Sequence, residues 1–283
     1  MSDQPTIGVA APNLARPANV VAIGAVGAVA GFLAGLFGVG GGLLIVPGLV
    51  LVAGMDQRLA HGTSLAAVLP ISVASLLTYA AHDNVDWAAA LWLSVGAVAG
   101  AVIGTRLLHV LPHRVLALLF AVVVLASAVR LFLATDATGR SPLSAAGVLA
   151  LVGVGLLAGI VAGLFGVGGG IILVPAMILL FGIPPVVAKG TSAAVIVPAA
   201  VMGTWRNRRR GNADLRAAAI VGAAGIVTAA LGGTIAGTMS DQLSNVLFAS
   251  LLVVVAGRLL WQLQRERMMA RRPYSSGSGA GGA

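Results

Sequence analysis

One nine-residue stretch occurs twice in this chain, and it limits what the chain can fold into. Residues 34–42 read Ala-Gly-Leu-Phe-Gly-Val-Gly-Gly-Gly, and residues 162–170 repeat all nine letters at an offset of 128. Each copy places four glycines within five residues of a run that is otherwise apolar. Because a glycine in a helix interior costs ~1 kcal/mol relative to alanine, the two copies predict interruptions in helices.

The rest of the sequence is typical of a helical membrane protein. Of its 283 residues, 59% are hydrophobic and 9% are charged, and residues 18–55 and 141–188 contain no charged side chain. A membrane-spanning helix needs about 20 apolar residues, so each of these runs has room for two apolar segments. The apolar runs are continuous and do not alternate with polar residues, which argues against a membrane β-barrel. We therefore predict an all-α polytopic membrane protein.

The offset of 128 persists through the second half, which indicates two repeats of about five segments each. The second segment of each repeat has only about 12 residues, or ~18 Å of helix, too short to cross a hydrocarbon layer of ~30 Å. The first two segments of each repeat are therefore expected to form a broken or re-entrant hairpin whose glycine-rich end lies inside the membrane. The expected segments are 20–38, 43–54, 62–81, 88–108, 114–134, 144–166, 171–182, 190–205, 216–237 and 242–262. The resulting divisions are an N-terminal segment (1–17), repeat 1 (18–134), a linker (135–143), repeat 2 (144–263) and a basic, flexible tail (264–283).

The distribution of charge predicts that the two repeats have opposite orientations in the membrane. Residues 82–86 carry two aspartates, whereas the equivalent loop of the second repeat, residues 206–216, carries five arginines. Cytoplasmic loops are enriched in Lys and Arg, so these equivalent loops are expected on opposite sides. Inverted repeats of this kind are typical of transporters that work by alternating access. Arg16 and the basic tail place both termini in the cytoplasm.

The glycines of the two copies are candidate binding residues. Without side chains, successive N–H groups can point into one concavity, and the following helix begins there with the positive end of its dipole. Such a site suits an oxyanion such as sulfite, a sulfonate, sulfate or a carboxylate. Close helix packing is the alternative role, and it is our interpretation of the glycines spaced by four at 27, 31, 35, 155, 159 and 163. The candidates for binding are Gly38, Gly40, Gly41, Gly42, Gly166, Gly168, Gly169 and Gly170.

Two pairs of hydroxyl side chains follow a second repeated glycine. Thr63 and Ser64, and their equivalents Thr191 and Ser192, stand at the start of the third expected segment of each repeat. Helix N-capping is the alternative role for these residue types, although a cap can also present its donors to an anion.

Lys189 is the only lysine in the chain and directly precedes the second hydroxyl pair, in the position that His61 holds in the first repeat. A cation here could attract an anion toward the site. The alternative is an interfacial charge whose aliphatic stem snorkels along the membrane surface.

The absence of certain residues narrows the function further. No Asp or Glu lies inside an expected segment, whereas a cation pathway or a carboxylate proton relay would need one at depth. The chain has no cysteine, and its four histidines lack clustered partners, so we expect no metal site, no cofactor and no catalytic residues. The net charge of +9 resides mostly in arginines at segment ends, so nucleic acid is not an expected partner.

The doubled GLFGVGGG, each copy followed by an apolar run with proline, then Gly-Thr-Ser and then a loop Asn-x-Asp, resembles the TauE/SafE family of sulfite and organosulfonate exporters. The resemblance extends from about Val20 to Leu263. It implies a permease of the bacterial inner membrane that moves sulfur-containing anions, with the glycine motif and the Gly-Thr-Ser motif at the site. We therefore expect a secondary transporter rather than an enzyme, with a small anionic solute and the lipid bilayer as its partners. An anion channel and a non-transporting membrane scaffold stay open as alternatives, as does a homodimer.

Overall fold

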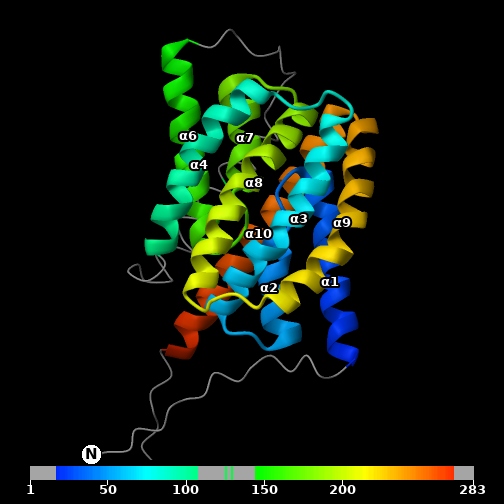
Figure 1. Cartoon of the computed structure of the whole chain (residues 1–283), viewed down its shortest axis with the longest axis vertical. Coiled ribbons are helices and arrows are strands. Elements are labelled where there is room, and N and C mark those ends of the chain that lie inside the picture. Colours follow the sequence, from blue (N-terminus) through cyan, green and yellow to red (C-terminus); the bar gives the residue numbers. More distant parts are fainter. Residues whose placement is uncertain (1–16, 108–124, 126–128, 130–143, 271–283) are drawn as a thin grey trace, which may run out of the picture.

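Helices make up all the regular secondary structure in the part of the chain that is described. The computed structural model describes residues 17–107, 125, 129 and 144–270. The expected all-α fold is confirmed for these residues. The expected segment 114–134 (apart from residues 125 and 129), the linker 135–143, and residues 1–16 and 271–283 of the expected terminal segments lie outside the described residues. The helices, labelled as in Figure 1, are α1 (Pro17–Phe37), α2 (Gly42–Ala53), α3 (Gln57–Ala80), α4 (Trp87–Leu107), α6 (Ala145–Phe165), α7 (Gly170–Phe181), α8 (Pro185–Arg209), α9 (Leu215–Thr238) and α10 (Asp241–Ala270).

Six of these described helices, α1, α3, α4, α6, α8 and α9, are long and apolar enough to cross a membrane. Helices α2 and α7 have 12 residues each and are too short to do so alone. Large apolar side chains point outward from the bundle, including Val21, Leu77, Leu149 and Val227. An outer surface of this kind suits lipid rather than water.

Both predicted interruptions are present, and glycines define their limits. Helix α1 ends at Phe37 and α2 begins at Gly42; helix α6 ends at Phe165 and α7 begins at Gly170. The residues that precede α2 and α7, Gly41 and Gly169, have φ of 77° and 82°. An L side chain is strained in this left-handed region, so the helices break where the sequence offers glycine.

The glycines spaced by four in α1 and α6 bring helices into close contact, as predicted. A Cβ atom added to Gly35 would lie 2.0 Å from the carbonyl oxygen of Ala229 in α9. A Cβ atom added to Gly159 would lie 2.1 Å from the carbonyl oxygen of Ala97 in α4. The pairs α1–α9 and α4–α6 therefore pack backbone against backbone, which only glycine permits.

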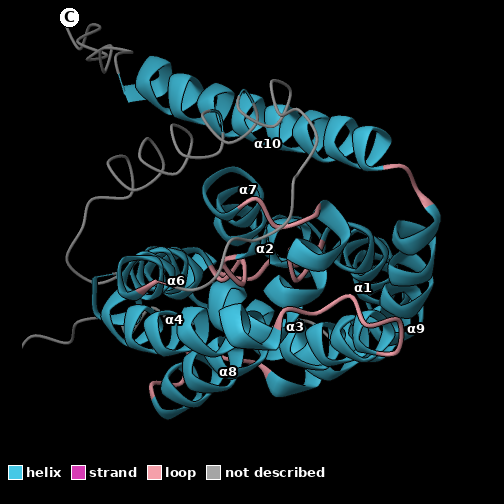
Figure 2. Ribbon diagram, turned by 90° about the horizontal axis from the view of Figure 1, so that it is seen from above, coloured by secondary structure: helices cyan, strands magenta, loops and turns pink. Residues whose placement is uncertain are grey.

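The close contact between α1 of repeat 1 and α9 of repeat 2 has an equivalent contact, between α6 and α4, in which the two repeats change places. Gly35 meets Ala229 of α9, and its equivalent Gly163 meets Ala101 of α4, the equivalent of Ala229. Seen from above, α2 and α7 lie in the middle, between the α1–α9 pair and the α4–α6 pair (Figure 2). Helix α1 rises from the lower edge of Figure 1, whereas its equivalent α6 descends from the upper edge. Equivalent helices of the two halves therefore run in opposite directions.

Three boundaries differ from the sequence prediction by five residues or more. Helices α3 and α8 begin at Gln57 and Pro185, five residues before the expected starts at 62 and 190. The side chain of Asp56 caps α3 by accepting a hydrogen bond from the N–H of Arg58 at 3.1 Å, and proline begins α8. Helix α10 continues to Ala270, so the boundary expected at residue 264 falls within a helix.

The close packing of α4 and α6 predicts a position-dependent cost for adding one methyl group. We expect Gly159→Ala to lower stability by about 1–3 kcal/mol, because the new Cβ would enter the α4 backbone. Gly153→Ala is the matched control on the same helix, since no atom lies within 4 Å of its added Cβ. Thermal unfolding of the purified protein in detergent measures both. Equal melting temperatures for the two variants would contradict this packing.

Candidate functional site

The two interruptions meet inside the bundle. We call residues 38–42 tip 1 and residues 166–170 tip 2; all ten residues are buried. A Cβ atom on Gly42 would lie 2.2 Å from the carbonyl oxygen of Gly166, and one on Gly170 would lie 2.6 Å from that of Gly38. The two tips therefore touch through their backbones.

Each tip carries buried amide groups that no described residue accepts a hydrogen bond from. The left-handed φ values repeat between the tips: 68°, 79° and 77° in tip 1, and 67°, 85° and 82° in tip 2. The N–H of Gly38 still bonds to Ala34 at the end of α1, and that of Gly166 bonds to Ala162 at the end of α6. Beyond those residues, no acceptor within the described chain takes the N–H of the third, fourth or fifth residue of either tip. A buried polar group without a partner costs ~1–3 kcal/mol, so these amides are ready to donate to a ligand or to water.

A serine from the opposite half holds each tip. The hydroxyl of Ser64 in α3 donates to the carbonyl oxygen of Gly166 at 2.9 Å, and that of Ser192 in α8 donates to the carbonyl oxygen of Gly38 at 2.8 Å. Both serines are buried. The serine protons are thus used to position the tips, while each serine oxygen keeps its capacity to accept.

The threonines of the same motif hold loops rather than tips. The hydroxyl oxygen of Thr63 accepts a hydrogen bond from the N–H of Asp214, and that of Thr191 accepts one from the N–H of Asp86, both at 2.9 Å. The N-capping interpretation of these hydroxyl residues is wrong. They lie about two turns inside α3 and α8, because those helices start earlier than the sequence indicated.

Lys189 is buried rather than interfacial, so its interpretation as a snorkelling surface charge is wrong. Its ammonium group donates to the hydroxyl of Ser244 in α10 and lies 5.8 Å from the centre of the Phe37 ring. A cation over an aromatic face is an attractive arrangement. The equivalent residue, His61, bonds through Nδ1 to the carbonyl oxygen of Phe165 at 2.6 Å. Both residues contact the ends of the interrupted helices, and the second half alone supplies a lysine there.

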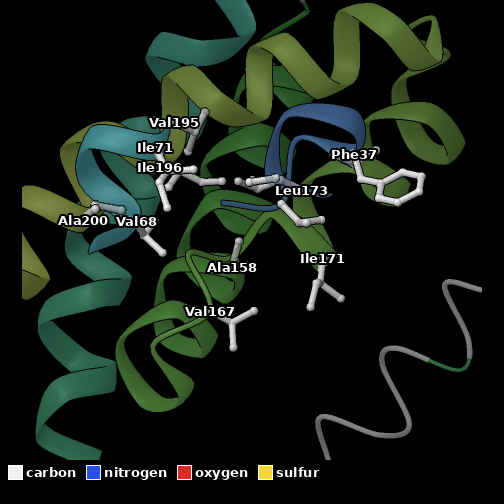
Figure 3. Close-up of a cluster of buried hydrophobic side chains, with 14 of the residues drawn as sticks. Phe37, Val68, Ile71, Ala158, Val167, Ile171, Leu173, Val195, Ile196 and Ala200 are labelled. Carbon is white, nitrogen blue, oxygen red and sulfur yellow. The ribbon is translucent and has the colours of Figure 1, made fainter. Parts of the chain in front are cut away.

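Apolar side chains surround the tips. Added Cβ atoms on Gly40 and Gly168 would both meet the side chains of Val68 and Ile196. These two side chains belong to the buried cluster drawn in Figure 3, which also holds Ile71. The unpaired amides therefore lie in an apolar setting, where a hydrogen bond or an attraction between charges is stronger than in water.

Two further polar residues near this site escaped the sequence analysis. Ser72 and Ser75 of α3 are buried, and neither hydroxyl has a hydrogen-bond partner among the described residues. By contrast, the hydroxyl of Thr78 in the same helix donates to the carbonyl oxygen of Ala74 at 3.0 Å. The available signal was a departure from the repeat, because the second half has Ala200 and Gly203 at the equivalent positions.

The arrangement of the described helices is typical of one class of membrane protein. Its described helices include six candidate spans, its halves exchange contacts in a two-fold manner, and two helices are interrupted where the halves meet. Broken helices at the interface of two repeats are typical of multi-pass membrane transporters. No cluster of three or more metal-binding side chains occurs within the described residues.

Comparison with known proteins agrees with this class. The family model described as "Sulfite exporter TauE/SafE" matches residues 23–154 and again residues 149–283, so each match takes in one glycine tip. The probable membrane transporter protein YunE of Bacillus subtilis is 28% identical over 83% of this chain and 95% of its own length. A probable membrane transporter protein of Xylella fastidiosa (strain 9a5c) is 30% identical over 86% of this chain and 95% of its own length. No solved structure gives a significant match.

The chain belongs to the TauE/SafE family. This is a family of membrane transporters, not of enzymes, and the protein is a multi-pass membrane protein of that kind. The resemblance drawn from the doubled glycine motif is thus confirmed.

We call the hydrogen bonds from Ser64 to Gly166 and from Ser192 to Gly38 the serine ties. They predict that removing one serine hydroxyl loosens the tip of the opposite half. We expect Ser64→Ala and Ser192→Ala each to destabilise the protein by about 1–3 kcal/mol, because a buried glycine carbonyl loses its donor. Ser250→Ala is the matched control, since that hydroxyl is exposed and bonds only to Val246 in its own helix. Hydrogen exchange at the tips, measured by mass spectrometry, should rise in the first two variants alone. Unchanged exchange at tip 2 in Ser64→Ala would show that the tie does not position it.

Proposed function

We propose that this protein is a secondary transporter that moves sulfur-containing anions, such as sulfite or organosulfonates, across the bacterial inner membrane by alternating access. The observation that carries the proposal is the pair of apposed tips, whose buried N–H groups have no acceptor within the described chain. Backbone donors of this kind at the start of a helix favour an anion with several oxygen atoms. The binding residues in this proposal are Gly38, Gly40, Gly41, Gly42, Thr63, Ser64, Gly166, Gly168, Gly169, Gly170, Lys189, Thr191 and Ser192.

The sign of the solute follows from the charges near the tips. Buried Lys189 lies 5.8 Å from the centre of the Phe37 ring, and Asp241 at the start of α10 is the described carboxylate that acts on it electrostatically. The described aspartates lie at helix ends or in loops, as with Asp56, Asp86 and Asp214. A cation would therefore meet donors and a like charge at the tips, whereas an oxyanion would meet complementary groups.

The orientation of the two repeats supports alternating access. In this proposal, repeat 1 (18–134) and repeat 2 (144–263) are inverted relative to the membrane, and each short hairpin re-enters from its own side. The basic loop between α8 and α9 lies at the lower edge of Figure 1, and the acidic loop between α3 and α4 lies at the upper edge. By the positive-inside rule we take the lower edge as the cytoplasmic one, and the proposal has both termini in the cytoplasm.

The serine ties suggest how access alternates. Both tips are buried in this structure, which corresponds to a state closed to both sides. Movement of one half against the other would lengthen the bond from Ser64 to tip 2 or the bond from Ser192 to tip 1, and so expose the amides to one side at a time. The pseudo-symmetry of the two ties makes the two open states mirror one another.

Substitutions at the tips separate transport from folding. We expect Gly40→Ala and Gly168→Ala to reduce sulfite uptake into proteoliposomes at least about tenfold, because a methyl group at left-handed φ distorts the amide positions and fills the space beside Val68 and Ile196. Gly54→Ala and Gly211→Ala are the matched controls. They have similar φ values of 62° and 70°, and no atom lies within 4 Å of the added Cβ.

The outcomes of this experiment distinguish the alternatives. Flux lost at the tips and kept in the controls supports the proposal. No flux of any sulfur anion above empty vesicles would contradict it and favour a scaffold, and unitary currents in a planar bilayer would indicate a channel, since carriers give none.

The contribution of Lys189 can be measured separately. We expect Lys189→Met to raise the KM for sulfite on the order of tenfold, because the variant keeps the buried apolar stem but removes the attractive charge. Lys189→Arg retains a cation and is the control for charge. Equal KM values for Lys189→Met and the unchanged protein would exclude an electrostatic role for this residue.

A further inference from the structure

Three arginines converge where α4 and α8 end, far along α8 from the tips. We call Arg106, Arg206 and Arg210 the arginine cluster. Arg210 caps the C-terminus of α8, one turn beyond Arg206, and its Nη1 donates to the carbonyl oxygen of Thr105 at 2.9 Å. That bond places the Arg210 guanidinium beside Arg106, the next residue of α4. The charges of Arg106 and Arg210 both act on Arg206, so the three cations lie close enough to repel one another.

The cluster lacks a compensating charge in the part of the chain that is described. None of its members forms an ion pair with a described carboxylate, and the Nε atom of Arg206 is buried without a hydrogen-bond partner. Like charges at short range repel, and a buried guanidinium nitrogen without an acceptor costs free energy. The positive-inside rule explains why arginines are abundant at this end of the bundle, but not why three converge around an unpaired buried donor.

The neighbouring aromatic residue indicates the depth of the cluster. Trp205 is 48% exposed on the outside of α8, and the guanidinium of Arg209 lies 4.0 Å from the centre of its ring. Tryptophan with a polar partner is typical of the interface between the hydrocarbon layer and the headgroups. Arg206 follows Trp205 directly, so the arginine cluster lies at the level of the lipid phosphates.

We propose that the arginine cluster binds the phosphate of an anionic phospholipid. A guanidinium presents a planar fork of donors that matches two phosphate oxygens, and basic pockets between membrane helices recognise anionic headgroups. The phosphate would accept the free Nε–H of Arg206 and offset the repulsion among the three cations. It would also bridge α4 of the first half to α8 of the second, at the face where the loop after α8 emerges.

The test titrates purified full-length protein with short-chain phosphatidylglycerol or phosphatidylcholine and follows the melting temperature. We expect phosphatidylglycerol to stabilise the unchanged protein more than phosphatidylcholine does. At about fivefold for each hydrogen-bonded arginine lost, Arg206→Gln with Arg210→Gln should weaken the apparent affinity about 25-fold. The matched control, Arg208→Gln with Arg216→Gln, removes the same two charges from exposed positions on α8 and α9 and should change it by less than about threefold.

Each other outcome overturns the proposal. Equal losses in the two double variants would show a general attraction to the basic surface rather than a site. Stabilisation by inorganic sulfate or phosphate that depends on Arg206 and Arg210, with no preference between the two lipids, would assign the cluster to a free anion. The single variant Arg210→Gln covers the case in which the double variant does not fold, because Arg210 is exposed; unaltered lipid preference in it would also reject the site.

Discussion

The amide hydrogens of the two tips, which find no acceptor among the described residues, are the constraint around which this fold is arranged. Within a bilayer the backbone must satisfy its own hydrogen bonds, and the long helices do so along their whole lengths. In each tip a few residues lack the backbone hydrogen bonds of a helix. The tips are buried, so neither lipid nor bulk solvent contacts them. The surrounding helices make this tolerable, because they enclose the open backbone in protein.

Glycine serves two distinct purposes here, and the structure separates them. In α1 and α6, glycines spaced by four remove side chains so that neighbouring helices touch, while the helices stay continuous. In the tips, clustered glycines allow left-handed φ and end the helices. The same residue type therefore either brings two helices together or interrupts one, depending only on its spacing.

Both tips could be predicted from the sequence, because clustered glycines interrupt a helix through local helix propensity alone. The same nine residues occur in both halves, so the prediction applied twice. The starts of α3 and α8 were missed, because residues such as Asp56 and Arg58 are polar enough to resemble a loop. The burial of Lys189 and the serine ties could not be predicted, since each depends on a partner more than 50 residues away. The arginine cluster could not be predicted either, because arginine is common at the cytoplasmic ends of membrane helices and its presence there does not indicate a site.

The exchanged serines have a consequence for biogenesis. Tip 1 enters the membrane with the first helices, but the hydroxyl that secures it belongs to Ser192, which is 154 residues further along the chain than Gly38. Until the ribosome has made α8, tip 1 lacks this hydrogen bond, although α2 can already pack against α1 and α3. Each duplicated half therefore acquires its full set of hydrogen bonds only after both halves have been made.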